Sequence, residues 1–161
     1  FIDTPGAYPG IGAEERGQGE AIAKNLFEMS QLKVPTISIV IGEGSSGGAL
    51  ALGVTDIIIM LENAIYSILS PEGFASILYK DSSKSSEAAE KMKITSKELK
   101  KLGVIDNIVK EPEAGAQEDF ETVCQNLKDI VKKYIKELSN KTQDELIEQR
   151  YEKYRKIGGI R

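Results

Sequence analysis

A short β-branched segment runs directly into a glycine-rich turn and then into a helix of small residues, and this succession most constrains the fold. Residues 35–41 are short and apolar enough for a buried strand of a parallel sheet. Residues 42–48 supply the turn, and residues 49–52 form a helix that Gly53 ends. The first N–H groups of such a helix lack helical partners and lie at its positive end. The chain therefore predicts an α/β fold with an anion-attracting turn.

Further short apolar runs and helical repeats fill the rest of the chain. Apolar residues between turn residues predict strands at 1–2, 56–61, 64–69 and 104–109. Apolar residues spaced three and four apart predict helices at 14–32, 72–79, 87–92, 96–102, 118–138 and 142–155. We expect Ser70, Ser96 and Thr142 to cap helices and Gly103 to end one.

Composition excludes several classes of site. The 161 residues include no histidine, which removes the commonest general base and every Ser-His or Cys-His dyad within the chain. The single cysteine, Cys124, excludes an intrachain disulfide and a Cys-rich zinc site, and favours a reducing interior compartment. A net charge of -4 and a pI near 5.1 argue against an electrostatic nucleic-acid binder. The apolar runs are far shorter than the ~20 residues of a membrane-spanning helix.

The first residues have the pattern of a strand that has already begun. Phe1 and Ile2 run into the turn sequence Asp-Thr-Pro-Gly, with no preceding Met and no signal-peptide pattern. A strand takes about five residues. We therefore expect a fragment whose upstream half is missing, with an exposed sheet edge where that half would pair.

Two familiar motifs overlap in the turn at 42–48, and neither is complete. Gly42-x-Gly44-x-x-Gly47 matches a dinucleotide fingerprint, with Glu62 about twenty residues on, but the helix that follows is too short to cross a Rossmann sheet. Gly44-x-Ser46-x-Gly48 matches the elbow of a serine nucleophile, but no histidine follows it.

An oxyanion hole is the third interpretation, and it needs no histidine. It requires two backbone N–H groups aimed at a developing negative oxygen. It also favours small residues, because the substrate must approach the backbone. The second donor is available in the turn Pro5-Gly6-Ala7. A turn that needs glycine for packing alone remains as the alternative.

Five segments together resemble one family, the alpha subunit of the bacterial acetyl-CoA carboxylase carboxyltransferase. They are FIDTPGAYPG at 1–10, GAEERGQ at 12–18, VIGEG at 40–44, SGGALA at 46–51 and SILSPEG at 67–73. The resemblance extends over the whole chain, including 95–109 and the charged C-terminal helices. Subunits of this family are about twice as long, which agrees with a truncated start.

The resemblance implies a crotonase-like fold, a spiral of ββα units followed by C-terminal helices. Residues 1–110 would be the crotonase-like core, and residues 111–161 a helical extension that packs on the core or on a partner. The implied reaction moves a carboxyl group from carboxybiotin to acetyl-CoA and gives malonyl-CoA for fatty acid biosynthesis. Carried over to this sequence, the hole for the biotin ureido oxygen comprises the N–H groups of Gly47 and Gly48, facing those of Gly6 and Ala7. Biotin itself would take the methyl proton of acetyl-CoA.

The resemblance also implies partners and cofactors. The carboxybiotin would arrive on a biotin carboxyl carrier protein, and acetyl-CoA and malonyl-CoA would bind mostly through a zinc-containing beta subunit in an alpha2beta2 assembly. ATP would be used by the biotin carboxylase of the holoenzyme and not bound here. We expect no metal, membrane or nucleic acid on this chain, and a cytoplasmic location. The residues that bind the cofactor are not assigned.

Several other residues have two interpretations each. Glu43 is either a base or, as we favour, a carboxylate that ties down the turn. Tyr8 and Tyr66 either line a biotin or partner surface or, as we favour, pack. We expect Cys124 to be inert in the core. A lysine-rich helix face is expected to be solvated rather than to bind phosphate; it comprises Lys128, Lys132, Lys133 and Lys136.

Two other classes of function remain open at this point. Without its upstream half and its partner, the chain would be an interaction module with no activity of its own. A different crotonase-type enzyme, such as an acyl-CoA hydratase or isomerase, would use the same hole with an added glutamate acid or base.

Overall fold

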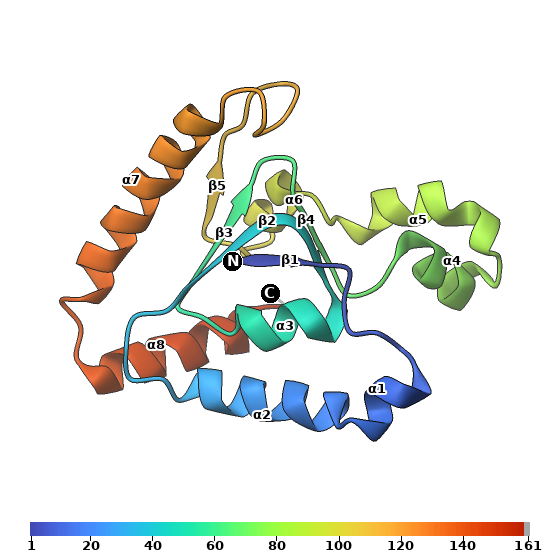
Figure 1. Ribbon diagram of the computed structural model, residues 1–161, viewed down its shortest axis with the longest axis horizontal. Coiled ribbons are helices and arrows are strands. Elements are labelled where there is room, and N and C mark those ends of the chain that lie inside the picture. Colours follow the sequence, from blue (N-terminus) through green and yellow to red (C-terminus); the bar gives the residue numbers. More distant parts are fainter. Residues whose placement is uncertain (160–161) are drawn as a thin grey trace.

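In the computed structural model, which describes residues 1–159, a parallel sheet is the centre of the molecule (Figure 1). Its strands are β1 (Ile2–Thr4), β2 (Ile37–Ser45), β3 (Ile57–Leu61), β4 (Ile65–Ser67) and β5 (Asn107–Val109). The order is β1-β2-β3-β5, and β4 also pairs with β2. All of these pairings are parallel, which confirms the α/β class.

The long strand β2 changes its partner midway. Its first half pairs with β3, from Ile37 opposite Ile57 to Val40 opposite Met60. Its second half pairs with β4, from Glu43 opposite Ile65 to Ser45 opposite Ser67. The strand therefore continues to Ser45 and places the start of the next helix at the end of the sheet.

Helices cover both faces of this sheet. They are α1 (Ile11–Glu15), α2 (Gln18–Ser30), α3 (Ser46–Gly53), α4 (Pro71–Tyr79), α5 (Ser85–Met92), α6 (Ser96–Lys101), α7 (Phe120–Leu138) and α8 (Gln143–Lys156), with a 3₁₀ turn at Ser82–Lys84. Figure 1 shows α7 on one side of the sheet, α2 and α3 on the other, and α4 and α5 projecting from the body. Within residues 1–159, no helix combines the length and apolarity needed to cross a bilayer.

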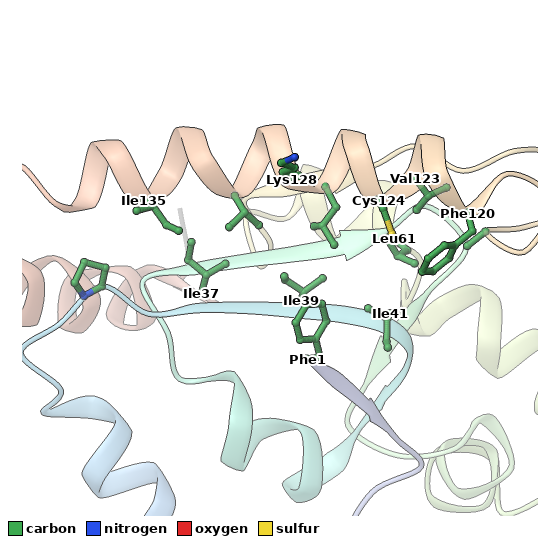
Figure 2. Close-up of a pocket in the computed structure, with 14 residues that line it drawn as sticks. Phe1, Ile37, Ile39, Ile41, Leu61, Phe120, Val123, Cys124, Lys128 and Ile135 are labelled. Carbon is green, nitrogen blue, oxygen red and sulfur yellow. The ribbon is translucent and has the colours of Figure 1, made fainter.

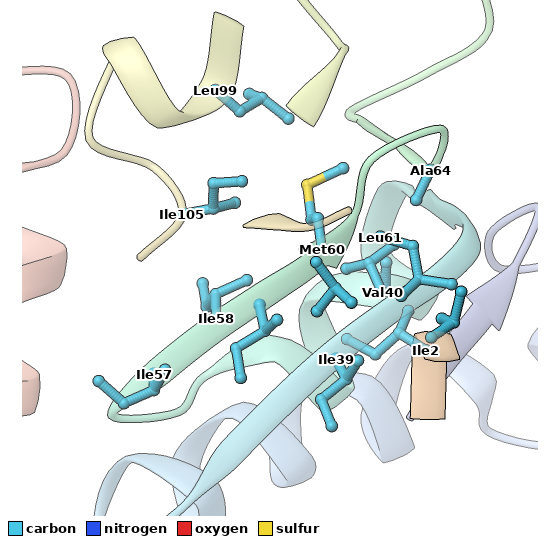
Figure 3. Packing of buried hydrophobic residues seen from close by; sticks show 14 of the residues in the cluster. Ile2, Ile39, Val40, Ile57, Ile58, Met60, Leu61, Ala64, Leu99 and Ile105 are labelled. Carbon is cyan, nitrogen blue, oxygen red and sulfur yellow. The ribbon is translucent and has the colours of Figure 1, made fainter. Parts of the chain in front are cut away.

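The core is built around β3, all five residues of which are buried. Figure 3 shows Met60 and Leu61 of β3 in one cluster with Val40 of β2 and Ile2 of β1. Val123, Leu138 and Leu146 belong to the same buried cluster, so α7 and α8 share the core of the strands. A strand buried on both faces has an uninterrupted apolar sequence, which is why residues 56–61 are easily found.

Several local signals in the sequence have the predicted effect. The Ser70 hydroxyl accepts a hydrogen bond from the N–H of Gly73 at the start of α4. Thr142 and Glu145 form a complete capping box at the start of α8. Gly103 follows α6 with a φ of 72°, a conformation that favours glycine.

Other expectations are wrong in detail. Residues 42–45 are strand rather than turn, because β4 pairs with them. The helix expected over 14–32 is two helices, since Gly17 adopts a φ of 77° between α1 and α2. The cap of α6 is Thr95, and the buried Ser96 instead donates to the carbonyl of Glu62 at 2.7 Å.

Candidate functional site

The two glycine-containing segments that the sequence singles out meet in space. An ideal Cβ built on Gly48 would lie 2.9 Å from the carbonyl carbon of Gly6 and 3.1 Å from the nitrogen of Ala7. Because these contacts are to backbone atoms, any side chain at residue 48 would push the two segments apart. The first turn of α3 therefore lies directly against the turn that follows β1.

A cavity of about 330 Å³ opens where these segments meet. Gly6, Ala7 and Gly48 line it, together with residues of α2 and α3. The fourth predicted residue, Gly47, is not in this lining, and a Cβ there would meet only Ile22, at 3.6 Å. The structure thus brings three of the four predicted residues to one cavity.

The backbone donors at this cavity are not equivalent. No side chain caps the start of α3, so its first-turn N–H groups are free of the helical ladder and of a capping bond. The N–H of Gly6, in contrast, donates to the Thr4 hydroxyl at 3.2 Å. The donors that can face a ligand are therefore those at the start of α3 and that of Ala7.

Gln18, the last residue of the segment 12–18, was given no role from the sequence, and it also lines this cavity. In the amide orientation that its neighbours require, its side chain donates to the carbonyl of Tyr8 at 2.8 Å and accepts from the N–H of Tyr8 at 3.1 Å. Gln18 therefore ties the start of α2 to the loop beyond Ala7. A side-chain amide after a glycine gives no local signal of such a contact, so sequence reasoning had no means of finding it.

The carboxylate that ties the end of β2 is that of Asp3, not that of Glu43. The Asp3 Oδ1 accepts from the N–H of Glu43 at 2.9 Å, across the pair of β1 and β2. The side chain of Glu43 is exposed. Gly42 faces the same carboxylate, since a Cβ there would lie 2.6 Å from Asp3 Oδ1.

The two serines of the turn have different environments. Ser45 is buried, with its hydroxyl 3.5 Å from that of Ser67. Ser46 begins α3 with a φ of 54°, an unusual conformation for a residue other than glycine. Its Cβ lies 3.2 Å from the position a Cβ on Gly6 would take, so Ser46 fills space beside the turn.

The remaining candidates are distributed over the surface and core. Tyr66 packs against the core, and burial raises the pKa of its hydroxyl. Tyr8 is exposed in its loop. Cys124 is exposed on α7, so its expected core position is wrong. The lysine-rich face is exposed, as expected, at Lys128, Lys132, Lys133 and Lys136.

A larger hollow lies elsewhere, between α7 and the sheet (Figure 2). We call this the α7 groove: about 820 Å³, lined mainly by apolar residues that include Ile37, Ile39 and Ile41 of β2 and Phe120 and Val131 of α7. Alternate residues of a strand share one face, which is why these three isoleucines line it together. The groove offers no cluster of polar groups for chemistry.

Across residues 1–159 no group of three or more acidic, cysteine or histidine side chains could hold a metal ion.

Sequence comparison relates the chain to carboxyltransferase subunits. A family model described as acetyl co-enzyme A carboxylase carboxyltransferase-like matches residues 1–158. An acetyl-coenzyme A carboxylase carboxyl transferase subunit alpha of Clostridium acetobutylicum is 60% identical over 158 residues, which cover 98% of this chain and 58% of the relative. A subunit of the same description from Bacillus cereus is 59% identical over 160 residues, 99% of this chain and 49% of the relative. The chain thus spans about half the length of these curated relatives.

Structural comparison finds the same fold in two solved enzymes. Transcarboxylase 12S, with methylmalonyl-coenzyme A bound, superposes with a TM-score of 0.72 at 19% identity, over 87% of this chain and 27% of that chain. A Pseudomonas malonate decarboxylase hetero-tetramer in complex with coenzyme A gives 0.73 at 16% identity, over 92% and 59%. These likenesses confirm the crotonase-like fold that the sequence resemblance implied.

Proposed function

This chain belongs to the acetyl co-enzyme A carboxylase carboxyltransferase-like family, and from that membership we propose that it carries half of a carboxyl-transfer site. The proposed reaction moves the carboxyl group of carboxybiotin to the methyl carbon of acetyl-CoA, giving malonyl-CoA and biotin. The nitrogen–carbon bond of carboxybiotin breaks, a carbon–carbon bond forms, and the methyl proton passes to the biotin nitrogen.

The observation that carries this proposal is the close approach of Gly48 to Gly6 and Ala7. A Cβ on residue 48 has no room there, so the backbone of Gly6, Ala7 and Gly48 forms one side of a cavity whose other sides are residues of α2 and α3. Such a wall suits a ligand oxygen that must approach N–H groups directly. The cavity, at about 330 Å³, is within the range of small-molecule sites.

The backbone performs the proposed catalysis. The N–H groups of Gly48 and Ala7, with that of Gly47 one position earlier in α3, would donate to the biotin ureido oxygen as it becomes negative. Loss of one such donor costs roughly 3 kcal/mol in the transition state. The Gly6 N–H, held by Thr4, would fix the shape of the turn rather than donate to substrate. Carboxybiotin supplies the carboxyl group when it is bound.

We propose the remaining partners on the same family basis. They are a zinc-containing beta subunit that would bind most of the CoA, in an alpha2beta2 assembly, the biotin carboxyl carrier protein, and the biotin carboxylase. The solved malonate decarboxylase of the same fold is described as a hetero-tetramer, which supports assembly from unlike subunits. A bacterial enzyme of this kind would act in the cytoplasm.

The test is malonyl-CoA formation by the full-length alpha subunit assembled with its beta subunit. We expect Gly48→Val to abolish carboxyl transfer while assembly stays measurable, because the side chain would push the two turns apart. Ser46→Ala is the matched control, and it should keep most of kcat. Turnover retained by the assembled Gly48→Val enzyme would contradict the oxyanion assignment. A thousandfold loss of kcat in folded Ser46→Ala would instead support a serine nucleophile.

A further inference from the structure

The helix that begins at the proposed oxyanion hole is held at its other end by α8. The hydroxyl of Tyr154 donates to the carbonyl of Gly53, the last residue of α3, at 2.5 Å. The same hydroxyl accepts from the N–H of Thr55 at 2.9 Å. About a hundred residues of chain separate Tyr154 from these partners, so the contact is a tertiary tie rather than part of a local turn.

Polar contacts fix the other residues of this connection between α3 and β3. The Thr55 hydroxyl lies 2.8 Å from that of Ser38 and donates to the carbonyl of Ile57. The ammonium group of Lys153 donates to the carbonyl of Asp56 at 2.9 Å. Residues 53–56 are therefore held in one position. Of the side chains named here, that of Tyr154 is the one that bonds to a residue of α3.

The hydroxyl of Tyr154 is suited to remain a donor. Burial raises its pKa to about 12, with smaller contributions from Tyr66 and Asp106. The group is therefore protonated at neutral pH and can donate to the Gly53 carbonyl there. Lys153 is the nearby cation, and its side chain pairs with Asp106.

A short helix transmits a displacement of its end to its beginning. With eight residues, α3 is only about 12 Å long at 1.5 Å per residue. Ala49 and Ala51 are buried, so the body of the helix is packed between its two fixed ends. In its first turn, Gly48 lies so close to the backbone of Gly6 and Ala7 that a Cβ atom would not fit between them. A small shift of Gly53 would therefore change how the donors of the two turns face each other.

We propose that Tyr154 is a positioning residue that sets the oxyanion hole by holding the far end of α3. Tyr154 touches no substrate; it acts through the Gly53 carbonyl. This inference rests on the proposed function, because it assigns the residue an effect on carboxyl transfer.

The first test is Tyr154→Phe in the assembled carboxyltransferase. We expect kcat to fall about tenfold with the KM for acetyl-CoA within twofold, because an interaction realised in the transition state is weakened. Tyr134→Phe is the matched control. Its hydroxyl also bonds at a partly buried position, to Asn107 and the Asp106 carbonyl, but it does not touch α3. It should leave kcat within twofold.

A second test keeps the ring and the hydroxyl in place. 3,5-Difluorotyrosine at position 154 has a more acidic hydroxyl, so donation to Gly53 would be lost at a lower pH. We expect the alkaline fall of kcat to move to lower pH relative to the unsubstituted enzyme. An unmoved profile, or equal kcat in Tyr154→Phe and Tyr134→Phe, would overturn the inference.

The Gly48→Val enzyme, assayed in parallel, distinguishes a failure of the proposed oxyanion hole from a failure of the proposed role of Tyr154. If it is inactive while both tyrosine tests fail, the oxyanion hole stands and the positioning role of Tyr154 falls. If it is active, the proposed function falls first, whatever Tyr154→Phe does.

Discussion

Gly47 and Gly48 are neighbours in the first turn of α3, but their surroundings differ. A side chain at residue 48 would meet the backbone of Gly6 and Ala7, which cannot rotate away. At residue 47 the nearest atoms belong to Ile22 and lie at ordinary contact distance, 3.6 Å or more. Neither Gly47 nor Gly48 has a positive φ. The two positions therefore differ in the room around a Cβ atom and not in backbone conformation.

This difference gives a prediction for stability. Gly48→Ala should destabilise the full-length subunit by ~1–3 kcal/mol, the usual cost of forcing extra atoms into a packed site. Gly47→Ala should be neutral or stabilise it by up to about 1 kcal/mol, because alanine favours a helix over glycine. Urea unfolding of the two variants would measure the contrast. Equal loss in both would contradict the packing account.

The sequence predicted that the two glycine-containing turns approach each other, but not which backbone groups of each turn are available to a ligand. Glycines beside small residues predict a close approach of backbone, and the turns at 5–7 and 42–48 were identified on that ground, whereas Gly47 and Gly48 were assigned from the family resemblance. The choice between Gly47 and Gly48 depends on which side of α3 faces Gly6, and only the packed structure decides that. The use of the Gly6 N–H by Thr4 is equally a matter of three-dimensional position.

At the scale of elements, α8 joins parts of the chain that flank the site. The guanidinium of Arg150, 1% exposed, pairs with Asp56 at 2.9 Å between Nε and Oδ1. It also donates to the carbonyls of Met29, Ser30, Leu32 and Val34 at and beyond the end of α2. One side chain thus satisfies the last two carbonyls of α2, two carbonyls of the segment that follows it, and the carboxylate before β3.

Removal of this guanidinium should be costly. Arg150→Met leaves the Asp56 carboxylate buried without its charge partner, for which we expect a loss of ~3–5 kcal/mol in unfolding free energy. Arg150→Met combined with Asp56→Asn should recover part of that loss, because the buried charge is gone. Lys156→Met is the control: its pair with Glu152 is exposed and contributes at most about 1 kcal/mol. A loss no larger than that of the control would show that the pair is not structural.

The elements differ in how far their sequences determine them. The starts of α4 and α8 were predicted because their caps lie within four residues of the partner groups. Residues 42–45 were not predicted as strand, since their partner in β4 is some twenty residues away and glycine has little strand preference of its own. The role of Ser96 was missed for the same reason: a cap is local, whereas its bond to Glu62 is not.

At the scale of the whole molecule, the α7 groove is an unfilled apolar surface (Figure 2). Phe1 is 79% exposed and Phe120 67% exposed at its rim. Apolar patches of this kind on a separated domain promote association. The charge of the chain does little to oppose this, because -4 is a modest net charge.

We therefore predict that the 161-residue chain, prepared alone, associates with itself and is inactive in carboxyl transfer. Sedimentation at increasing concentration should give species heavier than 17.6 kDa, and a hydrophobic dye should bind. Phe120→Ser combined with Ile135→Ser should reduce both effects, because these residues of α7 line the groove. Ile77→Ser is the control, since Ile77 is 68% exposed on α4, away from this groove, and should change them less. A monomer at all concentrations, with activity and no added subunit, would refute the prediction and the division of the site between two chains.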